Sequence, residues 1–107
     1  MDIQAMMQQA KQMQDRMKEM QDRLGTQEVI GESGGGLVKV TMTCKGEVKA
    51  IDISADLISK DEKETLEDLL VAAISVARTK SEETMSSETQ KMMEEFGIPG
   101  NIDLPGF

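Results

Sequence analysis

The first 24 residues carry apolar side chains in a strict heptad pattern. Their spacing alternates between three and four residues, and the members are Ile3, Met6, Ala10, Met13, Met17, Met20 and Leu24. This is the a/d spacing of a coiled-coil seam, and the intervening residues are good helix formers without Gly or Pro. The pattern predicts a helix over residues 2–24 that ends at Gly25.

Residues 26–53 change to a period of two, which predicts three short antiparallel strands. The second strand, "GLVKVTMTC", alternates most clearly, and its apolar face holds Val38, Val40, Met42 and Cys44. Lys45 and Gly46 then predict a tight hairpin turn. The third strand, "EVKAIDI", contributes Val48, Ile51 and Ile53.

Helical spacing returns over residues 60–96, where we expect one long or kinked helical region. Ser59 followed by Glu62 matches a capping box at its start. The run "LLVAAISVA" is apolar nearly all round, which predicts burial on more than one side. The Ser/Thr/Glu-rich stretch from Ser81 favours a kink or break, and Gly97 ends the helical spacing.

These elements predict a single domain over residues 1–97 of the α+β class, in the order α-β-β-β-α-α. A helical arm at 2–24 precedes a sheet at 26–53 and helices at 60–96. The last ten residues, 98–107, lack periodicity, and we expect them to form a flexible tail.

The apolar composition favours self-association. Aromatic residues make up only 2% of the chain, while ten Met residues supply flexible side chains that suit shared surfaces. A small domain with so few large side chains buries little surface by itself, and a second copy would add to the core. The candidate dimer contacts are Met13, Met17, Met20, Leu70, Ile74 and Ala77. In the alternative, the seam packs only on the domain's own sheet.

The polar composition argues against several function classes. The chain has no His and a single Cys, Cys44, so one copy cannot assemble a usual zinc site or an internal disulfide. No nucleophile stands beside an evident base, and we therefore expect neither an enzyme nor a cofactor. The absence of a long apolar run and of a signal-peptide pattern predicts a soluble, cytoplasmic protein without a membrane partner.

The glycine-rich stretch "GESGGGLVKV" raises the possibility of a phosphate-binding loop. Such loops open a helix, whereas the residues after Gly36 predict a strand. The stretch therefore fits a hairpin connection in which glycine tolerates positive φ, and Gly36 is a candidate for close approach of another backbone.

Charge is unevenly distributed along the chain. The formal net charge is −8, which argues against indiscriminate binding to nucleic acid. Residues 1–24 carry four basic and four acidic side chains, whereas residues 54–97 carry five basic and eleven acidic ones, a net of −6. A polyanion would therefore have to meet a local patch, and the first helix is the better candidate.

Taken together, the Gln/Met-rich first helix, "GESGGGLVKVTMTCKGEVKAIDIS", "DEKETLEDLLVAAISVARTK" and the closing "LPGF" resemble the YbaB/EbfC family of bacterial nucleoid-associated proteins. The resemblance extends over essentially the whole chain. It implies a tweezer-like homodimer whose terminal helices project from a shared body. It also implies binding to duplex DNA, a change in DNA conformation, a place in the nucleoid and effects on gene expression.

The resemblance further implies that the two helical regions make the DNA contacts. The basic residues on them are Lys11, Arg16, Lys18, Arg23, Arg78, Lys80 and Lys91. Each could instead be a solvated surface charge or part of an intrahelical pair, such as Glu19 with Arg23. A second function also stays open, in which the Met-rich seam docks a partner helix and the protein is an interaction adaptor that does not bind DNA.

Overall fold

A computed structural model describes residues 2–97 of the chain. Its main elements are α1 (Ile3–Leu24), β1 (Glu28–Ser33), β2 (Val38–Thr43), β3 (Val48–Ile53) and α2 (Lys63–Glu95). The strands form one antiparallel sheet in the order β1-β2-β3. This architecture confirms the predicted α+β class. The expected flexible tail, 98–107, lies outside the described residues.

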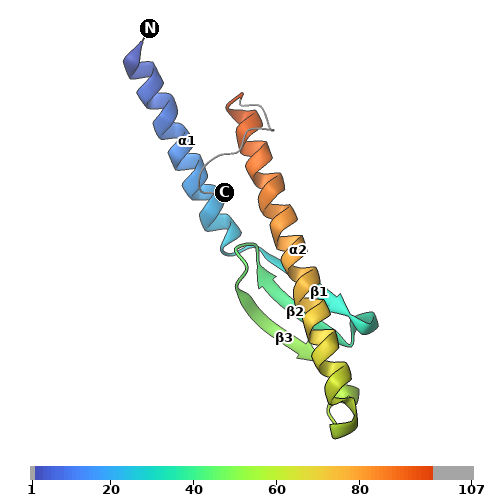
Figure 1. Ribbon diagram of the computed structural model, residues 1–107. Helices are drawn as coiled ribbons and strands as arrows, with labels where there is room; N and C mark the ends of the chain where they lie inside the picture. The colour runs from blue at the N-terminus through green and yellow to red at the C-terminus, as the bar shows by residue number, and fades with distance from the viewer. Residues whose placement is uncertain (1, 98–107) are drawn as a thin grey trace.

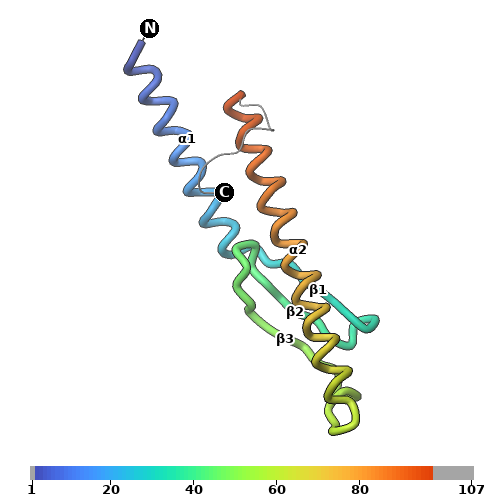
Figure 2. Tube along the Cα trace, in the orientation of Figure 1, coloured from blue at the N-terminus to red at the C-terminus, as the bar shows by residue number. Residues whose placement is uncertain are grey.

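The molecule is elongated because α1 and α2 extend from the same end of the sheet (Figure 1). Its principal dimensions are 71 × 23 × 18 Å. The first half of α2 covers one face of the sheet, and its second half runs beside α1 in the opposite direction (Figure 2). The structure thus has a sheet body and a two-helix arm.

The helix α1 follows the predicted heptad, but only its second half is packed. Asp2 caps its start, since the carboxylate accepts hydrogen bonds from the backbone N–H groups of Gln4 (3.0 Å) and Ala5 (3.3 Å). Near the sheet, Met20 and Leu24 are buried. At the other end, residues 3–12 are exposed along their whole length. The seam is therefore satisfied by α2 close to the body and is uncovered towards the tip.

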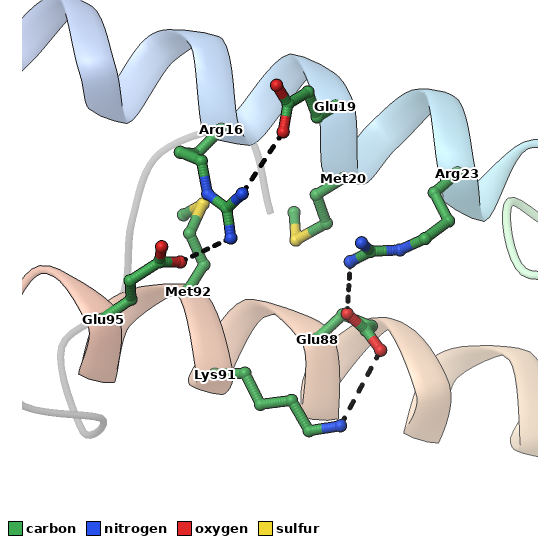
Figure 3. Close-up of a pocket in the computed structure, with 8 residues that line it drawn as sticks. All are labelled: Arg16, Glu19, Met20, Arg23, Glu88, Lys91, Met92 and Glu95. Carbon is green, nitrogen blue, oxygen red and sulfur yellow. Dashed lines mark hydrogen bonds and ion pairs between the residues drawn. The ribbon is translucent and has the colours of Figure 1, made fainter.

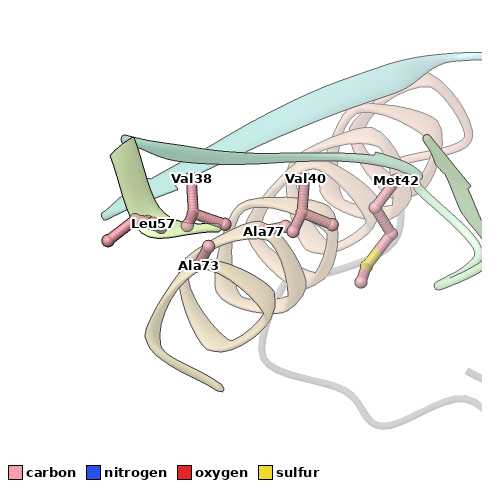
Figure 4. Close-up of a cluster of buried hydrophobic side chains, with 6 residues drawn as sticks. All are labelled: Val38, Val40, Met42, Leu57, Ala73 and Ala77. Atoms are coloured by element: carbon pink, nitrogen blue, oxygen red, sulfur yellow. The ribbon is translucent and has the colours of Figure 1, made fainter. Parts of the chain in front are cut away.

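The core of the body lies between β2 and α2 (Figure 4). Val38, Val40 and Met42 point from β2 towards the helix and are fully buried, as the alternating pattern predicts. Ala73 and Ala77 oppose them from α2 with no exposed surface. These small side chains allow the helix to lie close to the sheet.

The closest contact between helix and sheet is at Gly31 of β1. A Cβ atom added there would lie 2.3 Å from the carbonyl oxygen of Ala73 and 2.4 Å from the backbone nitrogen of Ala77. Only glycine fits at that distance. The prediction that placed a close backbone approach at Gly36 is wrong, because its nearest neighbours there are side-chain atoms at 3.6 and 3.9 Å.

The three glycines after β1 form the predicted hairpin connection. They make a short 3-10 turn, Gly34–Gly36, with φ angles of 61°, 67° and 95°. These angles lie in the left-handed region, where side chains other than hydrogen are strained. The strand β2 follows directly, and so the expectation of a connection rather than a helix-opening phosphate loop is confirmed.

The helix α2 differs from prediction at its start and in its middle. A 3-10 turn, Lys60–Glu62, precedes it, and the Ser59 side chain makes no capping hydrogen bond, so the predicted capping box is wrong. No kink or break occurs in the serine-rich stretch. The hydroxyl groups of Ser81, Thr84 and Thr89 instead donate to carbonyl oxygens three or four residues earlier, which satisfies them within the helix.

Candidate nucleic-acid interface

The base of the arm is held by a sulfur-rich cluster. Met20 and Leu24 of α1 meet Met92 of α2 and Cys44, and all four are at most 5% exposed. The half-buried side chains of Met17, Met85 and Phe96 extend the cluster. Cys44 is a free thiol buried in this core, as its place on the apolar face of the second strand predicts.

Above this cluster, α1 and α2 enclose a polar groove of about 190 Å³ (Figure 3). The groove holds equal numbers of opposite charges, since its lining includes three basic and three acidic side chains. They are Arg16, Arg23 and Lys91 with Glu19, Glu88 and Glu95. The groove therefore has no net charge, although it contains two of the predicted DNA contacts on α1.

Arg16 is shared between its own helix and α2. Its Nη2 atom lies 2.7 Å from Oε2 of Glu95, and its Nη1 atom lies 3.3 Å from Oε2 of Glu19. The hydrogen bond to Glu95 and the charge of that carboxylate raise the pKa of Arg16 above its ordinary value, and Glu19 adds a smaller effect. The guanidinium therefore stays charged, and its donors face carboxylates in the free protein.

Arg23 is bound in the same way one heptad closer to the sheet. It donates through Nη2 to Oε2 of Glu88, and Oε1 of Glu88 lies 3.9 Å from Nζ of Lys91. Glu88 thus serves two cations. The alternative of an intrahelical pair between Glu19 and Arg23 is wrong, because Glu19 pairs with Arg16 and Arg23 reaches across to α2.

The sequence contains a signal for these contacts that neither helix reveals by itself. Arg16 and Arg23 are seven residues apart, and so are Glu88 and Glu95. Two antiparallel helices bring such pairs together in crossed order, the first arginine with the second glutamate. Considered alone, the two glutamates look like solvated charges on a helix face.

The remaining predicted DNA contacts lie outside the groove. Lys11 and Lys18 are exposed, and their seven-residue spacing places them on one face of α1, away from the side that packs on α2. Arg78 is exposed on α2. Within residues 2–97, these three side chains take part in no ion pair. Lys80 donates from Nζ to the carbonyl oxygen of Ile30 at 2.8 Å, which ties α2 to β1.

The residues predicted for a dimer interface fall into two groups. Met20 and Ala77 are buried by contacts within their own chain. The others are only half-buried, and they are Met13, Met17, Leu70 and Ile74. The second group is the one that retains surface for a partner.

Two further properties concern residues 2–97 only. No helix there combines the length and apolar character needed to cross a membrane. The same part of the chain holds no cluster of three or more Cys, Asp or Glu side chains arranged for a metal ion.

The protein is therefore of the small α+β class, and its two long helices extend together from one end of an antiparallel sheet as an arm. The chain belongs to the YbaB/EbfC DNA-binding family, whose family model matches residues 1–96. This membership confirms the resemblance that the sequence indicated.

Relatives and a solved structure agree with the assignment. A nucleoid-associated protein of Neisseria meningitidis serogroup C is 57% identical over 101 residues, covering 91% of this chain and 87% of the relative. One of Nitrobacter hamburgensis is 50% identical over 103 residues, covering 96% and 97%. The crystal structure of an uncharacterised Helicobacter pylori protein matches with a TM-score of 0.76, at 22% identity, over 87% of this chain and 98% of that one. The structural match supports the fold.

Proposed function

We propose that the protein binds duplex DNA as a homodimer, changes the conformation of the DNA and acts in the nucleoid, where it contributes to DNA organisation and gene regulation. The observation that carries the proposal is membership of a DNA-binding family over residues 1–96. Two bacterial relatives at 50–57% identity are named nucleoid-associated proteins, which supports the place of action. The family is defined by binding, and we assign the protein no catalytic role.

Contacts to the phosphate backbone would dominate this binding. Lys11 and Lys18 are the best candidates, because they are exposed on one face of α1 and have no carboxylate partner within residues 2–97. Few free cations on a chain of net charge −8 imply modest affinity, with log K falling by about 0.9 per unit of log salt concentration for each phosphate that is neutralised. Arginine contacts to base edges are not required for such binding.

The test is the affinity for a duplex oligonucleotide, measured by fluorescence anisotropy at several salt concentrations. We expect Lys11→Ala/Lys18→Ala to weaken binding. The salt slope, which is the slope of log K against log salt concentration, should become shallower by about 0.9 for each phosphate that the variant no longer neutralises. Lys60→Ala/Lys63→Ala is the control, because it removes the same charge from the opposite end of the molecule, together with the exposed ion pair between Lys63 and Glu67. Equal affinities and slopes for the two variants would overturn these contacts.

The parent protein also decides between DNA binding and the adaptor hypothesis. Binding to duplex DNA at micromolar concentration near physiological salt supports the proposal. No binding at tens of micromolar would favour an adaptor that uses the uncovered part of the seam, where Ile3 and Met6 are 67% and 55% exposed.

A second copy would cover an apolar strip on the body. Val48 and Ile51 of β3 lie on the α2 side of the sheet, because they pair with Met42 and Val40, yet they are 44% and 47% exposed. The helix covers mainly β1 and β2.

The flank of α2 that faces β3 continues this apolar strip. Lys80 bonds to β1 from one flank of α2, and Ile74 lies on the other flank, which faces β3. The strip therefore joins Val48 and Ile51 to the predicted contacts Leu70 and Ile74.

The oligomeric state tests this surface directly. We expect light scattering to give a dimer mass for the parent at tens of micromolar and a monomer mass for Ile51→Lys. Ile30→Lys is the control, because Ile30 is equally exposed, at 48%, on the opposite face of the sheet. A monomeric parent would refute the dimer, and a dimeric Ile51→Lys variant would refute this interface.

A further inference from the structure

The groove between α1 and α2 joins the proposed DNA-binding arm to its own acidic residues. Arg16 and Arg23 are the two arginines of α1, and both direct guanidinium donors to carboxylates of α2. The arginines and Glu95 are well exposed, with Arg16 and Glu95 at 47% and 48% and Arg23 at 56%, whereas the side chain of Glu88 is 20% exposed. The pairs are thus accessible to a competing anion from solvent.

A phosphodiester group can make the same contacts as these carboxylates. Both groups present two oxygen acceptors to the planar fork of an arginine, and both are bound through charge-assisted hydrogen bonds. A duplex that approaches the arm would therefore compete with Glu95 for Arg16 and with Glu88 for Arg23. An exposed ion pair shifts an equilibrium by a factor of only about 1.4 to 5, so the carboxylates would weaken phosphate binding without preventing it.

We propose that Glu88 and Glu95 are affinity-setting residues that withhold Arg23 and Arg16 from DNA phosphate. This inference rests on the proposed function, since it concerns the strength of the same DNA binding. In the free protein the two arginines hold α2 against α1. On a duplex, each arginine contributes only to the extent that phosphate displaces its carboxylate. The two glutamates therefore keep affinity lower than the number of basic side chains on the arm suggests.

The structure offers a matched pair of variants. Glu88→Gln/Glu95→Gln neutralises both carboxylates that hold the arginines, and it changes the net charge by +2 per chain. Glu82→Gln/Glu94→Gln makes the same change on the same helix, at exposed glutamates that form no ion pair within residues 2–97. Any general effect of charge is therefore common to the two variants.

Affinity for a duplex oligonucleotide and its dependence on salt are the measurements. We expect Glu88→Gln/Glu95→Gln to bind about 2- to 25-fold more tightly than the control, the product of the two pair factors. Its salt slope should also be steeper by about 0.9 for each arginine that binds a phosphate in place of its glutamate. Equal affinity and slope for the two variants would overturn the proposal.

A second substitution separates released arginines from a loosened arm. Arg16→Ala/Arg23→Ala breaks the same ion pairs without supplying free cations. We expect it to remove most of the gain when it is added to Glu88→Gln/Glu95→Gln, because, within residues 2–97, Lys91 is then the only remaining cation that Glu88 had contacted. We expect it to raise no affinity on its own. If it tightened binding in the parent background, opening of the arm rather than release of arginine would be responsible, and the proposal would be wrong.

The outcome for the parent distinguishes this inference from the proposed function. Tighter binding by Glu88→Gln/Glu95→Gln than by its control supports competition between carboxylate and phosphate. If the parent protein does not bind DNA while this variant does, only the proposed function fails. Equal binding by the parent and all glutamate variants overturns the competition alone. No binding by any of these proteins overturns both.

Discussion

Replacing Gly31 with Ala gives the sharpest test of how the sheet and α2 fit together. The added Cβ would lie 2.3 Å from the carbonyl oxygen of Ala73, whereas ordinary contact begins at 3.4 Å. The obstruction is backbone, and no side chain can turn aside to relieve it. The helix would have to withdraw by the difference, about 1.1 Å, and thereby loosen the contacts of Ala73 and Ala77 with β2.

The energetic cost follows from this displacement. Overpacking a close-packed interior costs about 1–3 kcal/mol, and we expect about 3 kcal/mol here because two rigid elements must separate. With a urea m value of about 1.5 kcal/mol/M, the unfolding midpoint would fall by about 2 M. Far-UV circular dichroism during urea titration, at one fixed protein concentration, measures this change.

Gly35→Ala is the matched control. Gly35 has a φ of 67°, and an added Cβ would meet no atom within 4 Å. Its substitution introduces only the strain of a left-handed backbone, about 1 kcal/mol, and a midpoint shift of about 0.7 M. If Gly31→Ala shifted the midpoint no further than Gly35→Ala, the close approach of helix and sheet would not be what requires glycine at position 31.

Two further predictions concern α1. Leu24→Ala should lower the free energy of unfolding by about 3 kcal/mol, because it leaves a cavity beside Met20 and Met92, and it should accelerate amide exchange in the second half of α1. Met6→Ala, at an exposed position, should leave that exchange rate unchanged. Equal exchange rates in both variants would contradict a docked arm. Asp2→Ala should lower the stability of the helix start by about 1 kcal/mol and speed amide exchange in the first turns of α1 about fivefold, whereas Asp2→Asn keeps the cap. Identical exchange rates in these two variants would contradict capping by Asp2.

Local patterns were sufficient to predict most of the fold. The heptad of α1 ends at Leu24 beside Gly25, and the alternation of Val38, Val40 and Met42 identifies the buried face of β2. The glycines after Ser33 require left-handed backbone, which a hairpin connection provides. In each case the signal lies within a few residues of the structure that it predicts.

The features that local patterns do not predict depend on contacts between distant segments. Gly31 must be glycine because of Ala73, and Arg16 pairs with Glu95, 79 residues away. The serine-rich stretch of α2 remains helical because α1 packs alongside it, while its hydroxyl groups are satisfied by carbonyl oxygens of the same helix. Intrinsic preferences do not determine how α1 docks on α2, and so the pairing of the arginines could not be derived from either helix alone.

The geometry of α1 also makes it a lever. The helix leaves the sheet at Leu24, so that Arg16 lies about 12 Å from this pivot and Ile3 about 32 Å, at 1.5 Å per residue. A rigid rotation about the pivot would therefore move the tip roughly 2.6 times as far as the ion pair. If Arg16 withdrew from Glu95 by about 3 Å, the width of one water layer, the tip would swing by about 8 Å. Side chains that lie close to the body, and therefore close to the pivot, thus control how far the tip can move.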